Sequence, residues 1–113
     1  MIARQTDMYI KACMQAWLFC ESCIHNEVST QQPRTELIRK CHECAQSCFA
    51  VVSRLISDHP EVSELAFNCI IHCRLCQQEC EKFTEAEDIL QCAEMCRNCA
   101  EKMKDIAGNF CLN

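Results

Sequence analysis

The stretch CIIHCRLCQQEC, residues 69–80, places a cysteine at Cys69, Cys73, Cys76 and Cys80. Successive spacings of four, three and four residues are those of the buried stripe of an amphipathic helix. At about 100° per residue, the four side chains fall within an arc of roughly 60°. The pattern therefore predicts a helix whose buried face consists of thiols.

Comparable stripes of cysteine and apolar residues occur in three other segments of the chain. Helix-breaking residues are rare, with one Gly and two Pro in 113 residues, which favours long helices. Pro60 suits a first helical residue, Thr84 and Glu87 read as a capping box, and Gly108 suits the position after a helix end. These signals predict four helices, at roughly 4–27, 35–57, 60–83 and 85–107.

Four amphipathic helices with short connections favour an all-α fold, an antiparallel up-down four-helix bundle with a Cys-lined core. We expect residues 1–113 to form this bundle as a single domain. In such a topology the cysteine-rich half of every helix lies at the same end. The opposite end is then an ordinary apolar core, with these predicted members: Met8, Tyr9, Leu55, Ile56, Val62, Leu65, Met103 and Ile106.

The chain contains 14 cysteines, and neither a secretory signal nor a membrane-spanning run is recognisable. We therefore expect a soluble cytoplasmic protein, where many thiols indicate metal chemistry.

A net charge of −5 without a basic cluster argues against a nucleic-acid partner. No glycine-rich phosphate loop, Ser/His/Asp arrangement or open catalytic metal position is recognisable, so the sequence does not indicate an enzyme.

Disulfide bonds are one alternative role for the cysteines. Side chains three or four residues apart on a helix have Cβ atoms about 5–6 Å apart, whereas a disulfide needs about 3.5–4.5 Å. Pairing within a helix is thus strained, but pairing across helices is possible. A disulfide-stapled helical structural module therefore stays open as an alternative.

Metal binding is the role that the spacing favours, because thiolates are the ligands of soft metals such as Cu(I), Zn(II) and iron–sulfur clusters. Four thiolates around Zn(II) leave a net charge of −2, which is costly to bury repeatedly. Cu(I) is satisfied by two thiolates, and an array of bridging thiolates approaches neutrality at about one ion per cysteine. The stripe at 69–80 rises about 16 Å, which suits a column of multiple Cu(I) ions. Zinc binding or general metal buffering remains an alternative.

The candidate ligands are the cysteines on the four stripes. They are Cys13, Cys20, Cys23, Cys41, Cys44, Cys48, Cys69, Cys73, Cys76, Cys80, Cys92, Cys96 and Cys99. Four further residues are possible additional ligands: His25, His42, Met103 and Cys111. His25 follows Cys23 at the cysteine-lined end, and Met103 continues the last stripe. Cys111 lies outside the stripes, beyond Gly108.

The C-x3-C-x2-C-x3-C helix at 69–80, with partial versions at 41–48 and 92–99, resembles the bacterial copper storage proteins. The resemblance covers nearly the whole chain. It implies storage, buffering or detoxification of copper as Cu(I), bound mainly by pairs of thiolates, with ions entering at one open end of the bundle. It also implies a homotetramer of bundles. Because no secretory signal is recognisable, the chain resembles the cytosolic members of the family, and copper chaperones or efflux proteins are candidate partners. Cys111 and the wide Cys13–Cys20 spacing depart from the pattern.

Overall fold

The computed structural model describes residues 3–57 and 61–108, with side chains described from residue 6 onward. It contains four α-helices: α1 (Ala3–Val28), α2 (Thr35–Ser57), α3 (Val62–Cys80) and α4 (Glu87–Ala107). The predicted all-α class is confirmed. None of these helices, over the residues described, is both long and apolar enough to cross a membrane.

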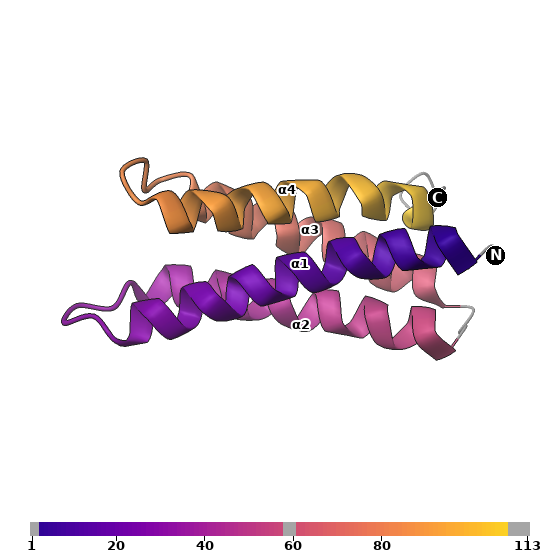
Figure 1. Cartoon of the computed structure of the whole chain (residues 1–113), viewed down its shortest axis with the longest axis horizontal. Coiled ribbons are helices and arrows are strands. Elements are labelled where there is room, and N and C mark those ends of the chain that lie inside the picture. The colour runs from indigo at the N-terminus through magenta and orange to yellow at the C-terminus, as the bar shows by residue number, and fades with distance from the viewer. Residues whose placement is uncertain (1–2, 58–60, 109–113) are drawn as a thin grey trace.

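The helices form an antiparallel four-helix bundle, as predicted (Figure 1). Each helix packs mainly against two others, so that α1 lies beside α2 and α4, and α3 lies beside the same two helices. The α1–α2 and α3–α4 connections lie at one end of the bundle, on the left in Figure 1. We call this the loop end. The start of α1 and the end of α4 lie at the opposite end.

Helix boundaries differ from the predicted ones mainly around the α3–α4 connection. α3 ends at Cys80, and residues 81–86 form turns in which the Phe83 N–H donates to the Cys80 carbonyl and the Ala86 N–H to the Phe83 carbonyl. The capping box was therefore wrong: the residue before α4 is Ala86, and the Thr84 hydroxyl donates to Glu85 instead. The turns lengthen the connection to residues 81–86, so α3 ends three residues before, and α4 begins two residues after, the predicted bounds.

The remaining helix-end signals have different outcomes. Gly108 follows α4 as predicted, with a left-handed φ of 53° and its N–H donating to the Lys104 carbonyl at 3.0 Å. A glycine adopts this conformation without the steric penalty that a Cβ would add. Pro60 lies outside the described residues.

The core divides along the bundle axis into a thiol-rich part near the loop end and an apolar part at the opposite end. Tyr9, Leu55 and Met103 are buried in the apolar part, where the Tyr9 hydroxyl donates to Asp105 at 3.1 Å. Two predicted members were wrong: Met8 is 41% exposed and Ile56 is 71% exposed. Each is adjacent in sequence to a buried residue, and about 100° of helical rotation carries it toward solvent.

Candidate metal centre

Thirteen cysteines line the interior of the bundle, and all thirteen are free and buried. Twelve have no exposed surface, whereas Cys23 is 6% exposed. Most come from the second half of α1 and α3 and from the first half of α2 and α4, and four lie near the middle of their helices: Cys13, Cys48, Cys69 and Cys99. The stripes predicted from sequence therefore do converge on one core.

Two overlapping groups of four thiols lie toward the loop end. The first comprises Cys20, Cys44, Cys76 and Cys96, and the second replaces two of these by Cys41 and Cys92. Within each group, the four Sγ atoms lie within 4.8 Å of one another. Cys20 and Cys76 belong to both groups, so the groups share an edge.

A third group lies deeper in the bundle and comprises Cys48, Cys69, Cys73 and Cys99, again with all Sγ atoms within 4.8 Å. Cys44 joins it to the groups at the loop end, because its Sγ lies 3.6 Å from the Sγ of Cys73. One helical pair in this group, Cys69 and Cys73, has its sulfurs 3.8 Å apart.

Contacts at both ends extend the three groups into one continuous sulfur column. At the deep end, Cys99 contacts Cys13 at 3.8 Å, and Cys13 contacts the Met103 Sδ at 3.7 Å. At the loop end, Cys76 contacts Cys80 at 4.0 Å. Every step along this column, from Met103 to Cys80, is a sulfur–sulfur distance between 3.6 and 4.0 Å.

The thiols of the column titrate as coupled groups, because neighbouring sulfurs dominate each shift and burial comes after them. Hydrogen bonding to Cys20 and Cys41 lowers the pKa of Cys76 to about 7. For Cys23, contact with Cys41 lowers the pKa, but contact with Cys92 and burial raise it by more, to about 12. A thiolate that accepts S–H bonds is stabilised, and the thiols that donate them keep their protons. Contacts between neighbouring thiols therefore favour ionisation at some positions of the column, such as Cys76, and oppose it at others, such as Cys23.

Comparison with known proteins agrees with this geometry. Residues 2–108 match the family described as copper storage protein. The chain belongs to this family. It is also 31% identical over 108 residues to the uncharacterized cysteine-rich protein YhjQ of Bacillus subtilis (strain 168), an alignment that covers 90% of this chain and 99% of that protein. No solved structure matches the chain significantly.

Membership of the copper storage protein family assigns copper storage, a non-enzymatic function. The sulfur column suits it, since its buried groups of four thiols can hold several metal ions.

A disulfide has an S–S distance of about 2.05 Å, much shorter than the contacts found here. A metal–sulfur bond of about 2.3 Å lets one ion bridge sulfurs about 3.8–4.6 Å apart, depending on the bond angle. Small shifts of the thiols therefore suffice to admit ions between them.

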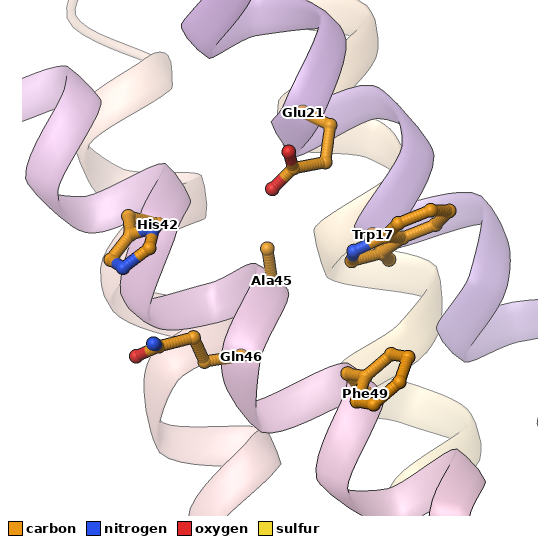
Figure 2. A pocket seen from close by; sticks show the side chains of 6 residues that line it. All are labelled: Trp17, Glu21, His42, Ala45, Gln46 and Phe49. Atoms are coloured by element: carbon orange, nitrogen blue, oxygen red, sulfur yellow. The ribbon is translucent and has the colours of Figure 1, made fainter.

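The four possible additional ligands lie in different places. The Met103 sulfur is buried at the deep end of the sulfur column. His25 and His42 are exposed, and neither belongs to the three groups of close ligand atoms. Figure 2 shows His42 on the outside of α2, beside a pocket that it lines with Trp17, Glu21 and three other residues. Cys111 lies outside the described residues.

Two buried carboxylates near the loop end were missed by the sequence analysis. Glu27 is 5% exposed and Glu79 is 9% exposed, and they are the only buried carboxylates among the residues described. Glu27 follows Cys23 by four residues, so it continues the α1 stripe by one turn. That spacing was the available signal, but Glu is mostly exposed in proteins, so the sequence analysis did not count this residue as part of the buried stripe.

Proposed function

We propose that the copper stored by this chain is held as Cu(I), with multiple ions per bundle bound by the thirteen buried cysteines. The observation that carries the proposal is the unbroken sulfur column, whose neighbouring sulfurs lie 3.6–4.0 Å apart. Thiolate is a soft ligand that favours Cu(I). Thiolates that each bridge two Cu(I) ions also keep the buried array close to neutral, which limits the cost of burying charge.

Anaerobic titration of the reduced protein with Cu(I), in competition with a strong Cu(I) chelator, tests this proposal. Saturation near one ion per buried cysteine is expected, with the bound copper silent in electron paramagnetic resonance because Cu(I) has a filled d shell. Saturation at one or two ions, or a Cu(II) signal from the bound metal, would overturn it.

Zinc buffering is a second candidate, favoured by a specific observation. Each of the three groups contains four cysteines whose sulfurs lie within 4.8 Å of one another, and four thiolates are a common zinc site. Parallel titration with Zn(II) distinguishes the two metals. Saturation near one Zn(II) ion per three or four cysteines, with no larger number of Cu(I) ions bound in the parallel titration, would favour zinc buffering.

We further propose a homotetramer of bundles. Support comes from large apolar side chains exposed on α1 and α2, including Leu18 at 55% and Phe49 at 58%, because exposed apolar surface is a common mark of protein interfaces. Sedimentation velocity on the reduced protein, with and without copper, measures the assembly. A species with the mass of one 13.0 kDa chain at micromolar concentration would exclude the tetramer.

A cytoplasmic location is the last part of the proposal. Its support is the need for reduced cysteines, which the cytoplasm maintains and oxidising compartments do not. Copper chaperones and copper efflux proteins of the same compartment are then the candidate partners. Cell fractionation with thiol trapping tests the location, and measurement of copper exchange with a purified chaperone tests the partnership.

A further inference from the structure

The sulfur column is covered at the loop end, although copper must pass through some part of the surface to reach it. Cys23 is the only cysteine with exposed surface among the residues described, and it lies near the end of α1. The deep end is closed by Met103 and Val51, each fully buried, and by Tyr9. The shortest path from solvent to sulfur is therefore at the loop end.

Glu27 lies on this path, one helical turn beyond Cys23. Its carboxylate accepts hydrogen bonds from Arg34: from the backbone N–H at 3.0 Å, and from Nη1 at 3.1 Å to one oxygen and 3.4 Å to the other. The Glu27 side chain is 6% exposed, whereas that of Arg34 is 45% exposed. A buried carboxylate is costly without a partner, so Arg34 holds Glu27 in place while remaining free to swing into solvent.

The same guanidinium also reaches the second connection at the loop end. Its Cζ lies 4.5 Å from the centroid of the Phe83 ring, a cation–π distance. Phe83 is half-buried against the core and lies between α3 and α4. Arg34 therefore bridges the α1–α2 connection and the α3–α4 connection, which Figure 1 shows at the same end. We call Glu27, Arg34 and Phe83 together the cover.

Two buried apolar residues complete this end beneath the cover. Leu37, in the first turn of α2, has no exposed surface, and Ile89, in the first turn of α4, is 4% exposed. Beneath them, Cys23 is the only cysteine with exposed surface among the residues described, so the sulfurs are shielded from solvent while the connections stay in place. The positive charge of Arg34 also repels an approaching cation, and its departure would leave the negative Glu27 beside Cys23.

We infer that the cover is a gate, which sets how fast copper enters and leaves the column without setting how much copper is held. This inference rests on the proposed function, because it concerns the passage of Cu(I) to the same thiols. Opening requires that the Arg34 side chain leave Glu27 and Phe83, which frees the two connections at the loop end to move apart. The thiol positions stay unchanged.

Two variants test the gate by different changes. Arg34→Ala removes the guanidinium contacts with Glu27 and Phe83 but keeps the backbone hydrogen bond to Glu27. Glu27→Gln retains the shape and an amide acceptor but removes the ion pair. Stopped-flow ultraviolet absorbance measures the rate of Cu(I) uptake from a chelator complex. The rate of copper release to excess chelator and the copper capacity are measured on the same variants. Both variants should take up and release copper faster, by about tenfold for Arg34→Ala, the size of rate change that losing one charge-assisted contact produces.

Lys82→Ala is the matched control. Lys82 also lies at the loop end and pairs with a buried carboxylate, Glu79, at 3.0 Å, but both residues belong to the end of α3 and its connection. This variant removes the same charge without unlinking the two connections, so its rates should stay at the wild-type values.

The outcomes separate the gate from the proposed function. Wild-type rates in both Arg34→Ala and Glu27→Gln, at full capacity, would overturn the gate and leave Cu(I) storage standing. Equal acceleration in Lys82→Ala would also overturn it, because net charge would then explain the effect. Failure of the wild-type protein to bind multiple Cu(I) ions would instead refute the proposed function. Circular dichroism of each variant confirms that the bundle is intact.

Discussion

The Cys13 thiol donates to the Met103 thioether across 3.7 Å, and this contact forms the deep end of the sulfur column. Both residues are fully buried, one from α1 and one from α4. A thioether binds soft metals but carries no charge and no proton. The deepest position in the column therefore offers one thiolate and one neutral sulfur.

Met103→Leu is expected to weaken the innermost copper site and to lower the capacity by about one ion, since Leu supplies no ligand. The substitution nearly conserves volume, so the free energy of unfolding should change by less than about 1.5 kcal/mol. Anaerobic Cu(I) titration measures the capacity. Met95→Leu is the matched control, because Met95 is half-buried on the same helix. Equal capacities in the two variants would assign Met103 to packing alone.

Cys20 and Cys80 differ in their number of sulfur contacts, which predicts unequal effects of their removal. Cys20 belongs to two of the groups of four, whereas Cys80 belongs to none and contacts Cys76 at 4.0 Å. Cys20→Ser should cost roughly two copper ions per bundle and Cys80→Ser no more than about one. Copper and protein assays after gel filtration give the numbers. Identical losses would argue against shared, bridging thiolates.

Copper affinity should rise with pH, because only thiolates bind and protons compete for them. Cys23, with its pKa raised to about 12, is protonated at pH 7 and must release its proton on binding. Cys76, with its pKa lowered to about 7, releases a proton on binding only when the pH is below that value. The affinity should therefore rise more steeply below pH 7 than above it, by about tenfold per pH unit for each proton released.

Competition titrations at several pH values on each side of pH 7, together with a pH indicator in weak buffer, measure this dependence. The chelator's own protonation is corrected from a blank series. An affinity that does not vary with pH, or copper binding without proton release, would contradict it.

The helical spacing of the cysteines was enough to predict the bundle and the convergence of its thiols. Burial of a stripe is a local property, so Cys69 and Cys73 could be assigned to one face without knowledge of the other helices. The antiparallel order followed from the short connections, and it placed the cysteine-rich halves together.

Features that depend on contacts between distant segments could not be predicted in the same way. Arg34 stacks on Phe83, 49 positions further along the sequence. The residues around Arg34 and those around Phe83 carry no signal that predicts this contact. Thr84 does not cap α4, because it lies within the turn that runs from Phe83 to Ala86 and the helix begins only at Glu87. Ile56 is apolar but faces outward, because helix rotation, and not hydrophobicity, decided its exposure.

The separation of the core into two parts predicts that stability and copper capacity respond to different substitutions. The reduced, metal-free chain should fold, because protonated thiols pack as small apolar groups and the apolar part of the core, opposite the loop end, contains no thiols that need a metal. Leu55, 8% exposed, belongs to that part and contributes no ligand. Leu55→Ala should lower the free energy of unfolding by about 2–4 kcal/mol and leave the copper capacity unchanged.

Urea unfolding of the reduced apo protein, followed by far-ultraviolet circular dichroism, measures the first effect, and Cu(I) titration measures the second. Cys96→Ala is the converse variant, because Cys96 is fully buried within a group of four. It should lower the capacity while costing less stability than Leu55→Ala, since fewer apolar atoms are removed. A reduced apo chain without helical signal would show that copper is needed to form the bundle, and the division of the core would then lose its physical basis.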